Sequence, residues 1–67
     1  MAMTAIKKIT PEEATAIIET REPRGLFYCL DENGAGELRY AGIDNRSGDA
    51  WTEDFKSLGA CKRWLVR

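Results

Sequence analysis

Apolar positions recur with two different periods along the chain, and the first of them is helical. Ala14, Ile17 and Ile18 recur at helical spacing, which predicts that their side chains lie on one face of a helix. Just before them, the motif Thr-Pro-Glu-Glu at 10–13 combines a capping box with proline at the first helical position. Because Pro23 disfavours helical geometry at the residue before it, we expect one amphipathic helix over residues 11–21.

The middle of the chain consists of short apolar and aromatic runs separated by turn-forming residues. The runs cover 26–30, 38–43 and 50–55, and the segments 31–36 and 44–49 between them are rich in Asp, Asn, Ser and Gly. Such segments are typical of tight turns, and the pair Asn-Gly at 33–34 can adopt positive φ. The pattern therefore predicts three strands joined as an antiparallel meander.

The last segment again has helical spacing. Ser57 is a candidate N-cap, and the apolar side chains that follow it fall on one helical face: Leu58, Cys61, Trp64 and Leu65. The sequence thus predicts a single α+β domain over residues 1–67, with an N-terminal helix, a three-stranded antiparallel meander and a C-terminal helix.

The run 26–30 has apolar or aromatic residues at both odd and even positions, which point to opposite faces of a strand. We expect two short helices to cover one face of the sheet, which leaves apolar side chains on the other face. Contiguous exposed apolar surface usually marks an interface, and a chain of 67 residues has only a marginal core of its own. We therefore predict a homo-oligomer, of which two-fold dimers are the commonest kind.

Ten basic and eleven acidic residues give a net charge of −1, without the basic excess typical of nucleic-acid-binding proteins. The cations Lys56, Lys62, Arg63 and Arg67 follow the last acid, but such a group is more typical of a solvated helix face. We find neither a signal peptide nor a membrane span and expect a cytoplasmic protein. Cys29 and Cys61 lie in apolar runs, which indicates buried free thiols.

The sequence has few of the residues that enzyme active sites use. It has no histidine, and neither cysteine has a cation placed to lower its pKa. Asp44, Asn45 and Asp49 resemble part of an oxygen-ligand loop, but the spacing of a calcium-binding EF-hand is absent. We predict a non-enzymatic protein with no catalytic residues, no metal and no cofactor.

The segment 42–51 carries the densest group of polar residues, and we predict a ligand site around it. An arginine can bind a phosphate through two hydrogen bonds, and an aromatic ring can stack on a base. The candidate ligand-binding residues are Arg39, Tyr40, Asn45, Arg46 and Trp51. Arg21 and Arg24 are further cations that a subunit interface can bring close. The alternative is that these residues form only a tight turn, with Trp51 in the core.

Four stretches resemble small accessory proteins common in phage and prophage genomes. They are Ile-Thr-Pro-Glu-Glu-Ala at 9–14, Gly-Leu-Phe-Tyr at 25–28, the segment 42–51, and Cys-Lys-Arg-Trp-Leu at 61–65. The resemblance implies a phage anti-defence protein in the host cytoplasm.

Three functions follow from this resemblance and from the residues. Our first hypothesis is a self-associating, non-enzymatic protein that sequesters a small nucleotide-type immune signal. The alternative is an inhibitor that binds a host defence protein, as anti-CRISPR proteins do, through Glu12, Glu13 and Glu19 or through the uncovered sheet face. A nucleic-acid-binding accessory protein that uses the last four cations is the weaker alternative.

Overall fold

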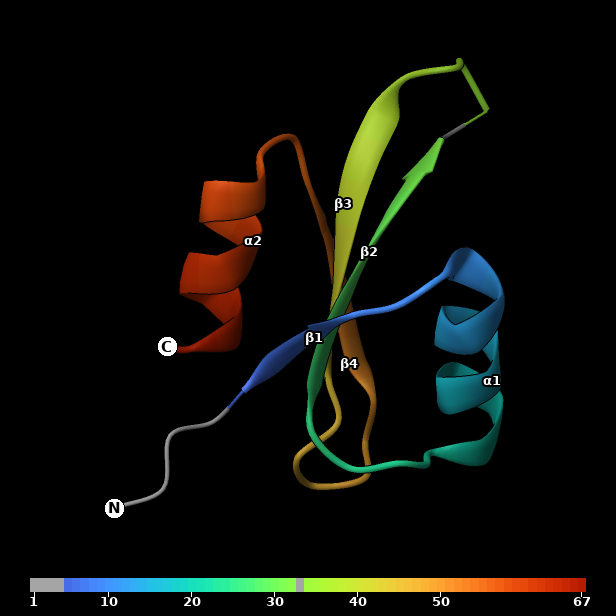
Figure 1. Ribbon diagram of the computed structural model, residues 1–67, viewed down its shortest axis with the longest axis vertical. Coiled ribbons are helices and arrows are strands. Elements are labelled where there is room, and N and C mark those ends of the chain that lie inside the picture. The colour runs from blue at the N-terminus through green and yellow to red at the C-terminus, as the bar shows by residue number, and fades with distance from the viewer. Residues whose placement is uncertain (1–4, 33) are drawn as a thin grey trace.

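The computed structural model describes residues 5–32 and 34–67, which form a four-stranded mixed sheet between two helices (Figure 1). The elements in chain order are β1 (Ile6–Lys8), α1 (Pro11–Thr20), β2 (Leu26–Glu32), β3 (Leu38–Asp44), β4 (Trp51–Phe55) and α2 (Leu58–Leu65). The strands lie side by side in chain order. β1 is parallel to β2, and the other neighbours are antiparallel. No helix in these two described ranges is long and apolar enough to cross a membrane.

Both helices begin at the residues that the sequence predicts. The Thr10 hydroxyl accepts a hydrogen bond from the Glu13 amide, and the Glu13 carboxylate accepts one from the Thr10 amide, which completes the capping box. α1 ends at Thr20, one residue before the predicted end, because Arg21 adopts left-handed backbone geometry and caps the helix. Ser57 caps α2 by accepting a hydrogen bond from the Ala60 amide.

The antiparallel meander is confirmed for β2, β3 and β4, but the prediction of three strands is incomplete. β1 adds a fourth strand, and α1 supplies the crossover that a parallel pair such as β1 and β2 requires. A three-residue strand is too short to show a period of two, which is why the pattern did not reveal it. β2 also continues through Asp31 and Glu32, which we had expected in the turn. Asn33 lies outside the described residues.

One face of the sheet packs against α1. The first core cluster on this face consists of Ile9, Ala14, Ile17, Phe27, Cys29, Ile43 and Ala50. The side chains from β2 and β3 in this cluster have odd numbers, so they all point to the same face of the sheet. α1 contributes Ala14 and Ile17, whereas Ile18, the third position of the predicted apolar face, is 41% exposed.

The other face packs against α2. The second cluster contains buried Leu26, Cys61 and Leu65, with Ile6, Tyr28, Tyr40, Phe55 and Trp64 packed around them. α2 approaches β3 closely at Gly42, where an added Cβ would lie 3.0 Å from the Cys61 sulfur and 3.2 Å from the Trp64 ring. The absence of a side chain at Gly42 is therefore what lets the helix lie on this face.

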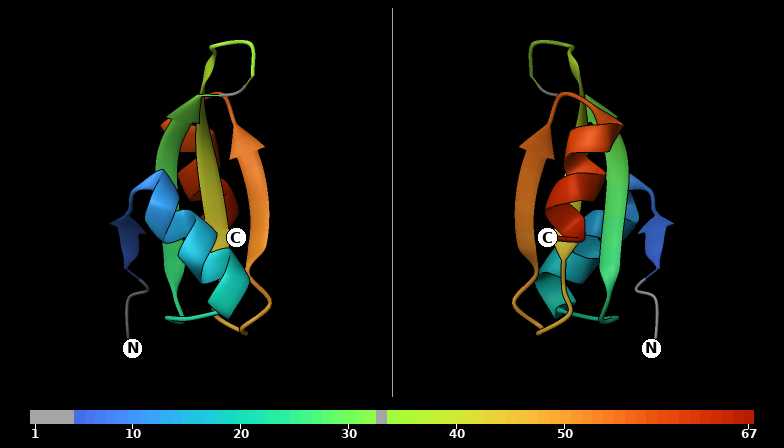
Figure 2. Two further views of the ribbon diagram at one scale, coloured as in Figure 1. Left: turned by 90° about the vertical axis from the view of Figure 1, so that its right-hand side faces the viewer. Right: turned by 90° about the vertical axis from the view of Figure 1, so that its left-hand side faces the viewer.

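The expectation that both helices cover one face is wrong, because α1 and α2 lie on opposite faces (Figures 1 and 2). β2 and β3 have apolar side chains of both parities, and one helix on each face covers both sets. The surplus apolar face on which we based the oligomer prediction is thus absent. Self-association remains a prediction, and it needs a different physical reason. The two cysteines are buried free thiols, as expected, and they lie in separate clusters.

The close approach at Gly42 predicts that Gly42→Ala destabilises the fold. The added methyl group lies closer to Cys61 and Trp64 than ordinary van der Waals contact, so these side chains must shift, and such overpacking costs about 1–3 kcal/mol. Urea unfolding at neutral pH measures the effect. Gly34→Ala is the matched control because nothing lies within 4 Å of a Cβ built there. Equal stability of the two variants would contradict the proposed packing.

Candidate functional site

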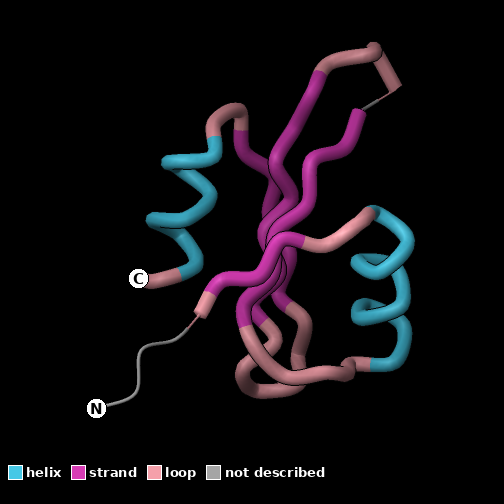
Figure 3. Tube along the Cα trace, in the orientation of Figure 1, coloured by secondary structure: helices cyan, strands magenta, loops and turns pink. Residues whose placement is uncertain are grey.

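Asn45, one of the predicted ligand-binding residues, joins two loops of the fold. Its side-chain nitrogen donates to the carbonyls of Arg21 and Pro23 at 3.0 and 2.8 Å, and its side-chain oxygen accepts from the Ala50 amide at 3.1 Å. Its backbone exchanges two further bonds with Gly25. Figure 3 shows the loops concerned close together at one end of the sheet. Asn45 has no exposed surface, so its side chain serves folding and does not reach a ligand.

Arg46, the second predicted residue in this loop, lies on a buried carboxylate. Its Nε and Nη2 donate to the two oxygens of Asp44 at 3.1 and 2.9 Å. Arg67, beyond the end of α2, reaches the same carboxylate at 3.5 Å. Hydrogen bonds from Arg46 lower the pKa of Asp44, burial opposes this shift, and the charges of both arginines reinforce it. One buried carboxylate thus holds two arginines whose side chains remain nearly half exposed.

One tryptophan contacts Arg67, and another is paired with Asp44 in the sheet. Trp51 is the neighbour of Asp44 across β3 and β4, so the two side chains lie on the same face of the sheet. Trp51 is 60% exposed, which excludes the core position that we kept as its alternative. The guanidinium of Arg67 lies 4.4 Å from the centre of the Trp64 ring, a cation–π contact. We call Arg46, Trp51, Trp64 and Arg67 the arginine–tryptophan surface.

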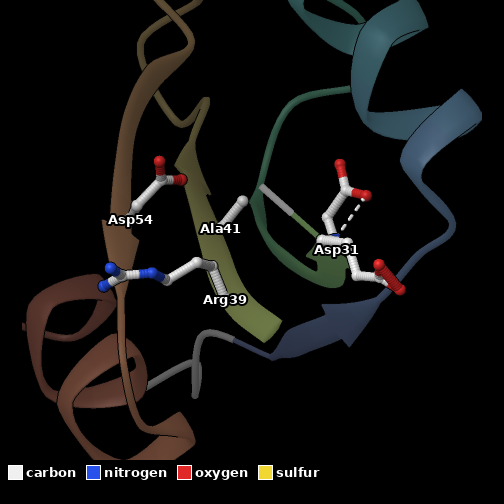
Figure 4. A pocket seen from close by; sticks show the side chains of 5 residues that line it. Asp31, Arg39, Ala41 and Asp54 are labelled. Atoms are coloured by element: carbon white, nitrogen blue, oxygen red, sulfur yellow. Dashed lines mark hydrogen bonds between the residues drawn. The ribbon is translucent and has the colours of Figure 1, made fainter. Parts of the chain in front are cut away.

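The two remaining predicted residues do not join this surface. Arg39 and Tyr40 are consecutive in β3 and therefore point to opposite faces. Tyr40 packs in the second cluster. Arg39 lies on the α1 side in a small pocket of about 90 Å³, with Asp31 and Asp54 among its lining residues (Figure 4). Its guanidinium is 3.5 Å from the Glu37 carboxylate.

Arg21 and Arg24 do lie at the loop, as proposed, but within one chain and without a subunit interface. Arg21 donates to the carbonyls of Gly48 and Asp49 at 3.4 and 2.9 Å. Arg24 donates to the carbonyl of Arg46 at 3.3 Å. Both arginines therefore hold the loop in its shape through hydrogen bonds to its backbone.

The structure thus brings together Arg46 and Trp51 out of the five predicted residues and adds three that we had not selected. These are Asp44, Trp64 and Arg67. Arg67 was noted only as one of four cations on a solvated helix face. Its role depends on where α2 lies against β3, which no local pattern shows.

Surface charge differs between the two helices. α2 and the residues around it expose Lys56, Lys62, Arg63 and Arg67, and the Lys62 ammonium lies 5.9 Å from the centre of the Tyr28 ring. α1 exposes Glu12, Glu13 and Glu19. Although the net charge of the chain is small, the α2 side is therefore basic and the α1 side is acidic. The arginine–tryptophan surface lies on the basic side, which favours an anionic ligand.

The described side chains offer few groups for other chemistry. Within residues 5–32 and 34–67, no group of three His, Cys, Asp or Glu side chains is placed to hold a metal ion. Burial is the largest effect that raises the pKa of both Cys29 and Cys61. At neutral pH both thiols are therefore protonated and weakly nucleophilic.

If Asn45 serves folding, Asn45→Ala should reduce stability strongly. The substitution removes three hydrogen bonds and leaves the Ala50 amide and two loop carbonyls to find other partners, which costs about 2–4 kcal/mol. Thermal and urea unfolding give the value. Ser47→Ala, an exposed change in the same loop, should stay within about 0.5 kcal/mol of the parent. A stable Asn45→Ala variant would refute the folding role.

The ion pairs of Asp44 predict a pH dependence of stability. Because the folded-state pKa of Asp44 is lowered, its contribution is complete above the unfolded-state value of about 3.9 and is lost as the pH falls through the folded-state value. Asp44→Asn should therefore be less stable at pH 7 and should lose less stability than the parent between pH 5 and 2. Urea midpoints across this range measure the difference. Glu19→Gln on α1 should keep the parent's profile, and a parent-like profile for Asp44→Asn would count against the pairing.

Comparisons with protein-family models, with curated proteins and with solved structures found no match to this chain. The case for a function therefore depends on the chemistry of the arginine–tryptophan surface.

Proposed function

We propose that this protein is a non-enzymatic binding protein that sequesters a small nucleotide on the arginine–tryptophan surface. Arg46 and Arg67 bind the phosphate, and Trp51 stacks on the base. The observation that carries the proposal is an exposed tryptophan whose partner across β3 and β4 is Asp44, the buried carboxylate that binds two arginines. This is the first hypothesis from the sequence, with a different set of residues: Arg46 and Trp51 are kept, and Trp64 and Arg67 are added. The role against an immune signal follows from the phage resemblance.

The arginines supply the donors that a phosphate needs. A guanidinium has five N–H donors, and Asp44 takes two from Arg46, through Nε and Nη2. The remaining donors lie on a side chain that is 44% exposed. Two arginines and one aspartate carry a net charge of +1, which suits a phosphate group. Because Asp44 already restrains the guanidinium groups, less side-chain entropy is lost when a ligand binds.

The tryptophan supplies the contact for a base. Trp51 is 60% exposed, and it has an aromatic face on which a planar base can stack. Such stacking contributes about 1–3 kcal/mol per base. The weakly nucleophilic thiols and the absence of histidine support binding without chemical conversion.

The proposal predicts a rise in melting temperature with one member of a nucleotide panel. The panel contains cyclic dinucleotides, cyclic trinucleotides and ADP-ribose derivatives. A ligand present at a hundred times its Kd stabilises the folded state by about 2.7 kcal/mol. Calorimetry then gives the Kd of each variant. Trp51→Ala should weaken binding at least about tenfold, and Arg46→Gln should do so as well.

Two matched controls separate binding from folding. Leu38→Ala removes an equally exposed side chain at the other end of the sheet, and Arg63→Gln removes a charge elsewhere on α2. Both should bind as the parent does. A panel without any thermal shift would refute the proposal. If only single-stranded oligonucleotides bind, with an affinity that falls steeply with salt, the nucleic-acid alternative would replace it.

A further inference from the structure

The two outer strands of the sheet carry opposite charges. β1 forms one edge and has the lysines Lys7 and Lys8, both exposed. β4 forms the other edge and has the acids Glu53 and Asp54, also exposed. Figure 2 shows each of these strands with a neighbouring strand on one side only. Each edge therefore presents backbone donors and acceptors together with side chains that suit the other edge.

The charges of the two edges are also complementary on each face of the sheet. The pairing register connects Lys8 through Tyr28 and Gly42 to Glu53, so Lys8 and Glu53 point to the α2 side. The intervening positions, Lys7 on β1 and Asp54 on β4, point to the α1 side. One lysine and one acid thus stand on each face of the sheet, at opposite edges.

We propose that β1 of one copy of this chain adds to β4 of a second copy, so that the sheets of the two copies become continuous. When both copies keep the same orientation, β1 runs parallel to β4, because both edges run in the same direction in the sheet. Their α2 faces then lie on the same side. The contact is head-to-tail, so a second copy leaves one edge free for a third.

One register places apolar and charged side chains together. If Ile6 lies opposite Trp51 of the second copy, Lys8 lies opposite Glu53, and both pairs are on the α2 side. Lys7 then lies diagonally across from Asp54 on the α1 side, within reach of a long side chain. This register covers part of Trp51, which is otherwise 60% exposed. Shifting β1 by two residues would put Ile6 opposite Glu53 and lose the apolar contact.

Symmetric pairing of like edges is less favourable. Two β4 strands side by side would bring two copies each of Glu53 and Asp54 along one seam without a cation on either strand. Two β1 strands would likewise gather four lysines. Like charges across strands are destabilising. The head-to-tail contact is the arrangement in which the charges of both edges are paired.

A charge exchange tests the proposal by sedimentation velocity at concentrations from about 10 μM to about 1 mM. For the parent, the mean mass should rise above 7.5 kDa with concentration and fall back in about 0.5 M NaCl. Lys7→Glu/Lys8→Glu has two acidic edges, and Glu53→Lys/Asp54→Lys has two basic edges. Each variant alone should therefore remain monomeric. An equimolar mixture of the two should associate again, because each edge of one variant then fits an edge of the other.

Controls separate the contact from general charge and from folding. Glu12→Lys/Glu19→Lys makes the same change in net charge as the β4 variant but on α1, and it should associate as the parent does. Circular dichroism shows whether each variant is folded. A parent that is monomeric at about 1 mM, or a mixture that stays monomeric, would overturn the proposal. The variants leave Arg46, Trp51 and Arg67 unchanged. Because the edge contact covers part of Trp51, nucleotide binding is measured on each variant alone, where this contact is absent and the two proposals fail separately.

Discussion

The fold depends on one constraint, which is that the central strands β2 and β3 have apolar side chains on both faces. Phe27, Cys29 and Ile43 point to α1, whereas Leu26 and Tyr28 point to α2. A sheet of this kind needs a cover on each side. With two short helices available, one must lie on each face. The chain therefore has two small clusters in place of one core, and each depends on the correct placement of a single helix.

The polar end of the sheet connects these layers. Asp44 and Asn45 are adjacent, but they serve different parts of the chain. Asn45 binds the loop that follows α1 and the residue that precedes β4. Asp44 holds Arg46 and, through Arg67, the end of α2. Folding and the proposed nucleotide site therefore share this end, and the arginines are ordered before a ligand arrives.

The covered faces determine where the protein can interact. Because each sheet face packs against a helix, the parts of the sheet that stay exposed are its strand edges and its two ends. The alternative function, an inhibitor of a host defence protein, was expected to use either an uncovered sheet face or the acidic side of α1. No sheet face is left uncovered, so only the acidic side of α1 stays a candidate for that contact. The proposed nucleotide site and the proposed edge contact both use these exposed parts of the sheet. Trp51 belongs to both, since it stands on an edge strand beside the arginines.

The sequence alone determined the features that depend on residues close in the chain. The capping box at 10–13, the Ser57 cap and the three strands of the meander arise from contacts or periods within a few positions, so a local pattern reveals them. It also led us to select Arg46 and Trp51 as candidate ligand-binding residues, because their side-chain chemistry is distinctive. The tertiary structure decided which sheet face each helix covers, that β1 joins the sheet, and that Asn45 is buried while Arg67 reaches Asp44. These outcomes depend on contacts between residues far apart in the chain, such as Ile6 with Leu26, Asn45 with Arg21 and Asp44 with Arg67, and such contacts leave no period in the sequence.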